Sequence, residues 1–407
     1  MVAAQTTAPL TATPRGAVTR LKWLYLINYA AYGCTSIYRN LYFRRVGLDN
    51  SELGLLIAVQ PLLMLVAGPL WSMLADRLNL RSRLLTVVMA LSVIPIIATP
   101  FCTRFWPLLG WSVLYALLQA PMQPLMDSSA VVALGANRHQ YSVIRAYGSL
   151  GYAPMVYLTG VAVQHIDLRW SFAGYVVLML IAAFVSLGVR SDECALQSRA
   201  LDGLEAVRKD RAWRVMMGAF FINTVLQAVA FGYSSLYLDT LGASEGLIGL
   251  SGAIGSLSQT LLMFTLLPWL VRHWGGERLL VFSLAMFCVR LSVWAFAPYP
   301  WAVAASEVMM GLTTGAALVG SVDFAARRAP PGMAATAQAL MSCFVNGLGR
   351  TLGSAATGRL YDGIGPQPLF AAYAGIAAAG ALGFAAIWRR QLRSPDSASA
   401  RESQAAS

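Results

Sequence analysis

Long apolar runs separated by short polar stretches recur along the whole of this 407-residue chain. Each run holds about 20 residues, which is the length that an α-helix needs to cross about 30 Å of hydrocarbon. The runs are nearly continuous and are interrupted by Gly and Pro, whereas the strands of a membrane barrel would be short and alternating. The pattern predicts twelve membrane-spanning helices, at 20–43, 51–75, 84–103, 106–130, 142–163, 168–189, 213–238, 244–272, 278–297, 301–326, 334–357 and 366–388.

A repeated string marks the connections that follow the first and the seventh runs. It reads Tyr-x-x-Leu-Tyr, then Gly, then Ser-Glu, and it begins at Tyr38 and again at Tyr233, 195 residues later. The packing of one helix does not require such a string twice, so the simplest explanation is a duplicated half-molecule. We therefore expect an all-α polytopic membrane protein with twelve transmembrane helices in two pseudo-symmetric six-helix bundles.

The organisation along the chain follows from these runs. We expect a disordered N-terminal tail, an N-terminal six-helix bundle, a cytoplasmic linker, a C-terminal six-helix bundle and a disordered C-terminal tail, at 1–18, 19–189, 190–212, 213–389 and 390–407. The first of these segments lacks the apolar core of a signal peptide, so the first helix itself is expected to direct the chain to the membrane.

Composition and charge support the same class. Hydrophobic residues make up 57% of the chain and charged residues 12%, whereas soluble domains average about 45–50% and about 25%. The net charge of +12 comes from Arg and Lys that gather in the tails and in every second connection, as the positive-inside rule requires. The basic charge therefore indicates membrane topology and contact with the lipid bilayer, and no nucleic-acid partner. Both termini are expected to be cytoplasmic, in a plasma (inner) membrane.

Several chemistries find no support in the sequence. It has neither the phosphate-binding string of an ATP-driven pump nor the HExxH string of zinc enzymes. The five Cys form no CxxC pair and the three His lack ligand spacing, so we expect no metal site and no cofactor. The string Gly242-x-Ser244-x-Gly246 fits a hydrolase elbow, but it lies in the repeated helix connection without the strand that such an elbow needs. We expect the chain not to be an enzyme.

Charged residues inside the apolar runs are more informative, because each costs at least about 2.5 kcal/mol at the centre of a bilayer. At a rise of about 1.5 Å per residue, Asp127 and Arg145 lie at one depth, near the cytoplasmic ends of the fourth and fifth helices. Arg290, Glu307 and Arg350 likewise share a depth, about 10 Å below the outer surface. Each group is either a structural ion pair that holds helices together or part of a solute or proton site.

The connection between the second and third runs carries a recognisable motif. Asp76, Arg77 and Arg81 match the loop pattern Gly-x-x-x-Asp-Arg-x-Gly-Arg-Arg, with Ser72 and Asn79 in place of its two glycines. In this feature the chain resembles the major facilitator superfamily, in which the loop latches the cytoplasmic side. The resemblance implies that Asp76, Arg77 and Arg81 form a gating loop and do not bind the solute.

A narrower resemblance covers nearly the whole chain. It is carried by Pro69-Leu-Trp71 with Leu74-Ala-Asp76, by Arg145-x-Tyr-Gly-Ser-Leu-Gly151 and by Glu307-x-x-x-Gly311. These strings are similar to those of the lactose-permease and nucleoside-symporter-like branch, which also holds the animal major facilitator domain-containing protein six.

In permeases of that branch, a carboxylate on helix four pairs with an arginine on helix five beside the substrate. An arginine on helix nine and a carboxylate on helix ten take part in proton coupling. The resemblance therefore implies a solute-binding ion pair of Asp127 and Arg145, and proton coupling by Glu307 and Arg290, which Arg350 joins by its depth. The carboxylates that sugar symporters carry on helices seven and eight have no clear counterpart here, so sugar specificity does not carry over.

Polar and aromatic side chains within the runs are candidates for the wall of a central cavity, although packing explains the tyrosines equally well. They are Asn28, Tyr29, Tyr32, Gln60, Gln119, Asn223 and Gln227. We expect a monomeric carrier of a small polar organic solute that works by alternating access as a proton symporter. Two alternatives stay open: a facilitative uniporter, and a membrane receptor of the same fold that binds its ligand without transport.

Overall fold

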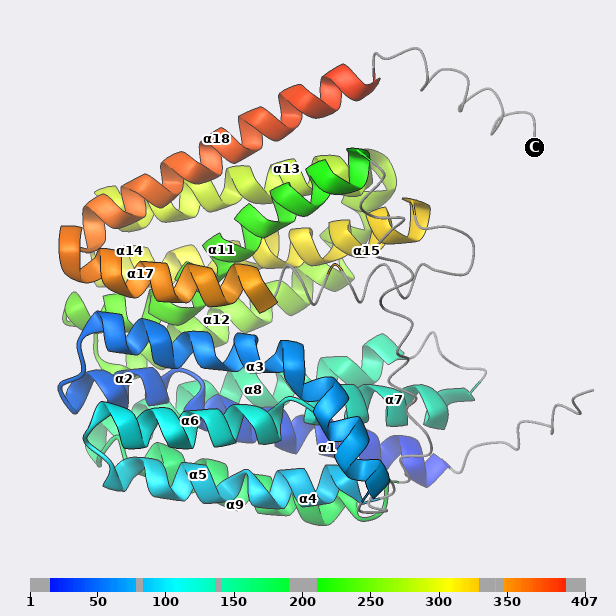
Figure 1. The fold of residues 1–407 in the computed structure, drawn as a ribbon, viewed down its shortest axis with the longest axis vertical. Coiled ribbons are helices and arrows are strands. Elements are labelled where there is room, and N and C mark those ends of the chain that lie inside the picture. Colours follow the sequence, from blue (N-terminus) through cyan, green and yellow to red (C-terminus); the bar gives the residue numbers. More distant parts are fainter. Residues whose placement is uncertain are drawn as a thin grey trace, which may run out of the picture.

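The computed structural model of the protein describes residues 15–77, 83–135, 141–189, 211–328, 341 and 347–392. Within these ranges the chain is helical, with short connections and no strand. The helices run roughly side by side (Figure 1), and α1 begins at the same end of the bundle at which α18 ends. We call this the proximal end, and we call the opposite end, where 46–49, 166–169 and 241–244 connect helices, the distal end.

The first half crosses the bundle six times within the described ranges. Its elements are α1 (Arg15–Thr35), α2 (Tyr38–Arg45), α3 (Asn50–Arg77), α4 (Leu84–Leu91), α5 (Val93–Ala98), η1 (Thr99–Phe101), α6 (Phe105–Gln119), α7 (Met122–Leu134), α8 (Tyr141–His165) and α9 (Trp170–Ser186). The crossings made of several pieces are α1 with α2, α4 with α5 and η1, and α6 with α7. Pro121 lies between α6 and α7, where its missing N–H removes a helical hydrogen bond.

The second half repeats this arrangement. Its elements are α11 (Arg211–Thr240), α12 (Glu245–Phe264), α13 (Leu266–Phe296), α14 (Pro300–Ser306), η3 (Glu307–Met309), η4 (Gly311–Gly315), α15 (Ala316–Arg328), α17 (Arg350–Ile364) and α18 (Pro366–Leu392). Gly275 has a φ of +78° inside α13, a conformation that side chains rarely adopt, and the chain turns there. The start of α13 therefore completes the eighth predicted span, and its remainder forms the ninth.

Within the described residues the predicted spans agree with the observed helices, with one error; the predicted start of the eleventh span, at 334, lies outside them. The eleventh was expected to end at 357, but α17 continues to Ile364. Six described segments are long and apolar enough by themselves to cross a membrane: Leu84–Phe101, Ala212–Thr240, Glu245–Phe264, Leu266–Phe296, Pro300–Arg328 and Pro366–Arg389. Most of both predicted tails and of the predicted linker lies outside the described residues.

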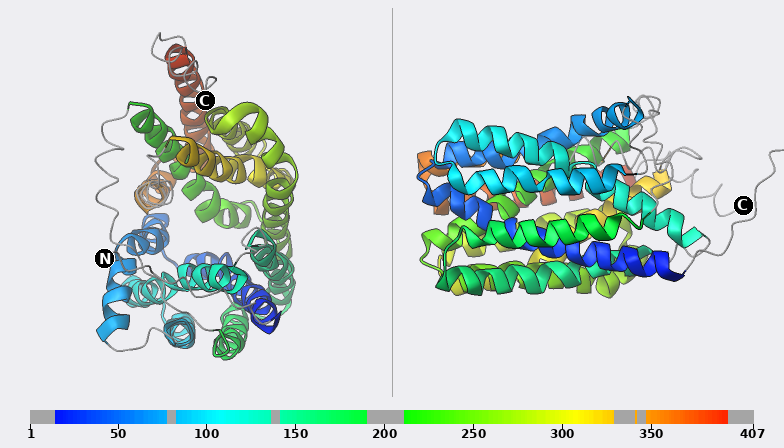
Figure 2. Two further views of the ribbon diagram at one scale, coloured as in Figure 1. Left: turned by 90° about the vertical axis from the view of Figure 1, so that its right-hand side faces the viewer. Right: turned by 90° about the horizontal axis from the view of Figure 1, so that it is seen from below.

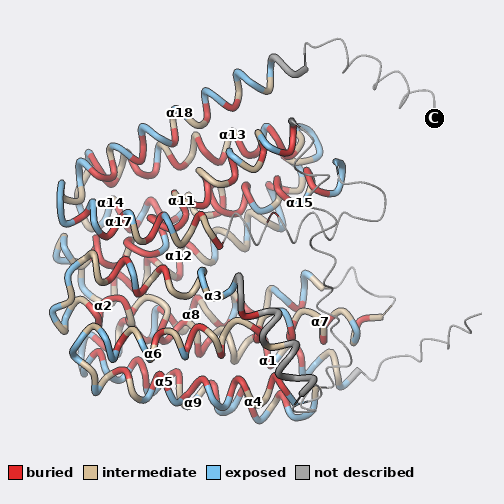
Figure 3. The backbone as a smooth tube through the Cα atoms, in the orientation of Figure 1, coloured by how far each residue is buried: buried red, intermediate tan, exposed pale blue. Residues whose placement is uncertain are grey.

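The helices form two groups, which Figure 2 shows nearly end-on. One contains α1 to α9 and the other α11 to α18. Buried residues line the inner sides of the helices and exposed residues their outer sides (Figure 3). The halves meet along two helix pairs, because α17 packs along α3 and α12 packs along α8.

The two repeat-related tyrosines lie at these helix pairs, and both are fully buried. Tyr38 donates its hydroxyl hydrogen bond to the Val156 carbonyl of α8 at 2.5 Å, and Tyr233 donates to the Ser354 carbonyl of α17 at 3.0 Å. The other half supplies a glycine beside each hydroxyl, namely Gly249 of α12 and Gly54 of α3. The repeated string thus builds the contact between the halves twice.

Charged groups add to this contact at the distal end. Arg45 pairs with Glu245 of the other half, and Arg44 Nε lies 3.8 Å from Asp239 Oδ2. Within the described ranges, polar contacts between the halves reach from the distal end as far as the hydrogen bond of 2.7 Å from Thr260 to Ser149. None of those described lies nearer the proximal end. The structure is therefore the state that is closed at its distal end.

A candidate solute and coupling site

Glu307 lies where the tenth span departs from regular α-helix. α14 is followed by the 3₁₀ turn η3, which begins with Glu307, and then by the π-helical segment η4. Short π-helical stretches within helices occur frequently at functional sites, because they change which side chains face a neighbour. The irregular helix geometry therefore points to Glu307, the residue that its depth in the membrane also indicates.

Arg290 of α13 forms a direct ion pair with Glu307. Arg290 Nη2 lies 2.6 Å from Glu307 Oε2, and the two side chains are only 3% and 6% exposed. Ser234 of α11 donates its hydroxyl hydrogen bond to Glu307 Oε1 at 2.6 Å. The guanidinium of Arg290 also lies over the Trp294 ring at 5.4 Å, while its Nε has no hydrogen-bond partner. Both carboxylate oxygens of Glu307 have a polar partner, whereas the Nε of Arg290 has none.

The pair lies near Tyr152, a residue of the first half of the protein. Tyr152 of α8 is close enough to Glu307 for electrostatic interaction. Tyr152 in turn accepts or donates a hydrogen bond of 3.0 Å with Ser36, and its ring lies 6.1 Å from that of Tyr32. A change of charge at Glu307 would therefore be felt at the boundary between the halves.

Arg350 lies deeper than the sequence indicated. Because α17 ends at Ile364, Arg350 is about 21 Å from the distal end at 1.5 Å per residue, whereas Glu307 is about 10 Å from it. Arg350 Nη2 instead donates to Gln227 Oε1 at 3.1 Å. The Gln227 amide donates to Asn223 at 2.8 Å, and Asn223 donates to Ser283 at 2.7 Å. The prediction that Arg350 lies at the depth of Glu307 is therefore wrong. Arg350 instead belongs to a hydrogen-bond network with the amides of Gln227 and Asn223.

Asp127 and Arg145 are connected through Tyr141, which interacts with both of them. Asp127 accepts hydrogen bonds from Tyr25 at 2.5 Å and from Gln123 at 2.7 Å, and Arg145 donates to the Tyr141 hydroxyl at 3.4 Å. Tyr141 interacts electrostatically with both charged residues. Among the described residues no direct ion pair joins Asp127 to Arg145 in this state.

The other predicted wall residues occupy both halves. Tyr29 donates to Gln123 at 2.8 Å, and Gln60 donates to Gln119 at 2.6 Å. Asn28 has a buried side-chain oxygen without a hydrogen-bond partner. The sequence reasoning missed Gln123 and Tyr141 as site residues. Both stand four residues, one helical turn, before a predicted charge, and that spacing was a usable signal.

The predicted gating loop lies mostly outside the described residues. Asp76 and Arg77 end α3, where the structure describes the helix but not these side chains, and Arg81 falls in the gap at 78–82. In the described ranges no cluster of His, Cys, Asp and Glu could hold a metal ion.

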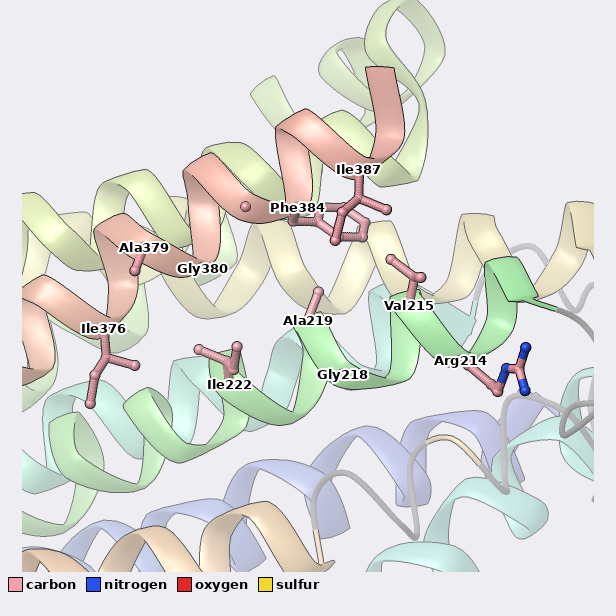
Figure 4. Close-up of a pocket in the computed structure, with 11 residues that line it drawn as sticks. Arg214, Val215, Gly218, Ala219, Ile222, Ile376, Ala379, Gly380, Phe384 and Ile387 are labelled. Atoms are coloured by element: carbon pink, nitrogen blue, oxygen red, sulfur yellow. The ribbon is translucent and has the colours of Figure 1, made fainter. Parts of the chain in front are cut away.

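An apolar pocket of about 500 Å³ lies away from these residues. It is formed between α11 and α18 (Figure 4), both of the second half, and Arg214 is its one charged lining residue. Ile222, Ile376 and Phe384 are among its apolar walls. None of the candidate site residues lines it, so it is not the site that the charges indicate.

The family model described as MFS_1 like family matches residues 18–372. The chain belongs to the MFS_1 like family. This MFS_1 like protein is 26% identical to the maltose permease of Geobacillus stearothermophilus, over 80% of this chain and 83% of the relative. It is 25% identical to the probable 3-phenylpropionic acid transporter of Escherichia coli strain K12, over 75% and 83%. The crystal structure of the nucleoside transporter NupG superposes with a TM-score of 0.78 at 16% identity, over 91% of this chain and 99% of that one.

The family and the fold together make this MFS_1 like protein an integral membrane transporter of solutes, and not an enzyme. The twelve-helix fold in two bundles, predicted from the apolar runs and the repeat, is confirmed.

Removing the carboxylate of Asp362 should weaken the distal closure of this MFS_1 like transporter. Asp362 of α17 accepts hydrogen bonds from the backbone N–H groups of Asn50 and Ser51 at 3.3 and 2.8 Å, and from their side chains at 2.7 and 2.8 Å. It therefore caps the first turn of α3 from the other half, and such caps contribute about 0.5–2 kcal/mol. For Asp362→Ala we expect the ratio of distal-closed to distal-open molecules to fall by a factor of about 2–30, measured by spin-label distances between distal loops.

Asp167→Ala is the matched control, because within the described ranges this exposed carboxylate accepts only from the nearby Arg169 backbone N–H, at 2.7 Å. Equal effects of the two substitutions would contradict the assigned role of Asp362.

Proposed function

We propose that this transporter is a proton-coupled symporter of a small polar organic solute, working by alternating access between its two halves. The observation that carries the proposal is the buried pair of Arg290 and Glu307, which lies near Tyr152 of the first half. Ionisable residues within membrane spans commonly mark ion and substrate pathways.

Protonation of Glu307 is the proposed link to the proton gradient. A neutral Glu307 attracts Arg290 much less, so the pair separates more easily. Its carboxylate is the only one at this depth among the described residues, and it starts the irregular segment of the tenth span. Loss of the pair would therefore let η3 and η4 shift against α13, and this shift biases the equilibrium between the two states.

Asp127 and Arg145 are proposed to bind polar groups of the solute near the proximal end. Their contacts through Tyr25, Gln123 and Tyr141 form a polar cluster that a solute could reorganise. We further propose that both termini are cytoplasmic in a plasma membrane, as the distribution of basic residues favours. The distal-closed structure is then the inward-facing state of the carrier.

Glu307→Gln should separate coupling from transport. The variant keeps the shape of the side chain and the hydrogen bond from Ser234, but it carries no charge to gain or lose. In proteoliposomes loaded and supplied with maltose, 3-phenylpropionate or a nucleoside, we expect counterflow exchange at a rate within about threefold of wild type. We expect accumulation driven by an imposed pH gradient to be lost.

Accumulation by Glu307→Gln equal to that of wild type would overturn the coupling role. Wild-type uptake that only equilibrates, whatever the pH gradient, would establish the uniporter alternative. Saturable binding to wild type without any entry would establish the receptor alternative. Glu52→Gln, which changes an acid in the first turn of α3 at the distal end, is the matched control and should accumulate solute normally.

A further inference from the structure

Arg350 is a charged residue at the centre of the protein that the proposed coupling step does not use. Within the described part of the chain it has one hydrogen-bond partner, the neutral amide of Gln227, at 3.1 Å. Its Nε is buried without a partner, and its guanidinium lies over the Phe231 ring at 5.7 Å. An arginine inside a membrane span normally pairs with an acid or with carbonyl groups, so Arg350 lacks a counter-ion in this state.

The charges at the middle of the bundle do not balance. Glu307 is already occupied by Arg290 at 2.6 Å and by Ser234. Asp127 is about 33 Å from the distal end at 1.5 Å per residue, and Arg350 is about 21 Å from it, so Asp127 is too deep to serve as its partner. The described residues therefore leave one positive charge at this depth without a negative charge.

Arg350 lies at mid-depth beside the opposite half of the protein. Tyr32 of α1, in the opposite half, is close enough to Arg350 for electrostatic interaction. Gln227 lies about 20 Å from the distal end, at nearly the depth of Arg350, and Tyr32 is about as deep. Arg350 thus stands at mid-depth on the boundary between the halves, with an aromatic ring and an amide beside it.

We infer that Arg350 binds the carboxylate of the solute, so that this transporter carries a small organic anion; the inference rests on the proposed transport function. A guanidinium presents parallel N–H donors that match the two oxygens of a carboxylate. Gln227 accepts a hydrogen bond from one terminal nitrogen of the Arg350 guanidinium. Gln227 is itself oriented by its hydrogen bond to Asn223, which donates to Ser283. A neutral sugar offers no group that would compensate the charge.

The inference predicts an unusual effect of Arg350→Gln. A structural arginine stabilises the empty protein, so its loss lowers the melting temperature. An arginine that waits for a ligand is instead an uncompensated buried charge, so its replacement by a neutral side chain leaves the empty protein equally or more stable. Arg39→Gln is the matched control, because Arg39 also lies over an aromatic ring, Tyr115 at 4.8 Å, with a buried Nε that lacks a partner.

The experiment measures the melting temperature of the purified full-length protein in detergent, with 3-phenylpropionate, its neutral amide and maltose as probes. For wild type and Arg39→Gln, we expect saturating 3-phenylpropionate to raise the melting temperature by at least about 2 °C and the amide to have no effect. For Arg350→Gln we expect the empty protein to melt no lower than wild type and the affinity for the carboxylate to fall at least about tenfold.

Three results would overturn the inference: stabilisation of wild type by the amide as much as by the carboxylate, stabilisation by maltose alone, or a lower melting temperature of empty Arg350→Gln. Binding of maltose alone would leave proton-coupled transport standing, so failure here is distinct from failure of the proposed function. The proposed function is tested separately, by whether Glu307→Gln loses gradient-driven accumulation, and the binding assay does not depend on that measurement.

Discussion

Gly358→Ala should reduce the initial rate of solute uptake at least about fivefold, although it adds a single methyl group. Gly358 of α17 packs against α3 so closely that a Cβ would overlap the backbone carbonyl oxygen of Asn50 and stand 3.0 Å from the Cα of Gly54. Backbone atoms cannot turn aside as a side chain can, so the two halves must separate at the distal end. Overpacking of this kind costs about 1–3 kcal/mol, which changes a two-state equilibrium by about 5–150-fold.

The control for this prediction lies on the same helix. Gly363 is exposed, and a Cβ added there would have no neighbouring atom within 4 Å, so Gly363→Ala should transport normally. Gly160→Ala tests the second helix pair, since a Cβ on Gly160 of α8 would meet the Glu245 carbonyl at 2.5 Å. Wild-type uptake rates for both Gly358→Ala and Gly160→Ala would show that the distal contact is not part of the transport cycle.

Arg290→Ala should be the most destabilising single substitution among the charged residues of the candidate site. It leaves the carboxylate of Glu307, 6% exposed, without its cation, and breaking a buried pair in this way costs about 3–5 kcal/mol. Loss of the contact with the Trp294 ring adds to the effect. We expect the melting temperature of the purified protein to fall by roughly 10 °C.

A double substitution distinguishes the charge from the packing. Arg290→Met combined with Glu307→Gln removes both charges at similar volume, and replacement of a whole buried pair is often close to neutral. We therefore expect the double variant to recover most of the lost stability but not gradient-driven accumulation. If Arg290→Ala melted within about 2 °C of wild type, the pair would contribute little to the folded state.

Most of the fold could be predicted from the sequence because the signals act locally. A run of about 20 apolar residues requires a spanning helix wherever it lies, and the Tyr-x-x-Leu-Tyr repeat indicated two halves. The one wrong helix end has a physical reason. The polar string from Arg359 to Asp362 resembles a loop, but Asp362 is used to cap α3 across the boundary between the halves.

The site could be predicted only in part, because depth follows from residue number but the direction of a side chain does not. Depth arithmetic brought Arg290 and Glu307 together correctly, since both nearby helix ends were placed within a few residues. The same arithmetic failed for Arg350, where an error of seven residues in the helix end moved the side chain by about 10 Å. Whether Asp127 faces Arg145 depends on helix rotation and on Tyr141, and neither can be read from spacing.

Some residues of the molecule repeat between its two halves, as the duplicated tyrosines do, and others occur in one half alone. Tyr38 and Tyr233 stand 195 residues apart, as do Gly54 and Gly249, and Gly160 and Gly358 stand 198 apart. The two tyrosine–glycine contacts are therefore related by an approximate two-fold symmetry, as in a dimer of identical chains. Glu307 and Arg350 break that symmetry, because at the same offsets Glu307 corresponds to Ser112, and Arg350 to Tyr152. An ancestor assembled from two copies of one half could therefore already have opened and closed at its distal end. After the two copies were fused in one gene, one half could acquire residues such as Glu307 and Arg350 that the other half lacks.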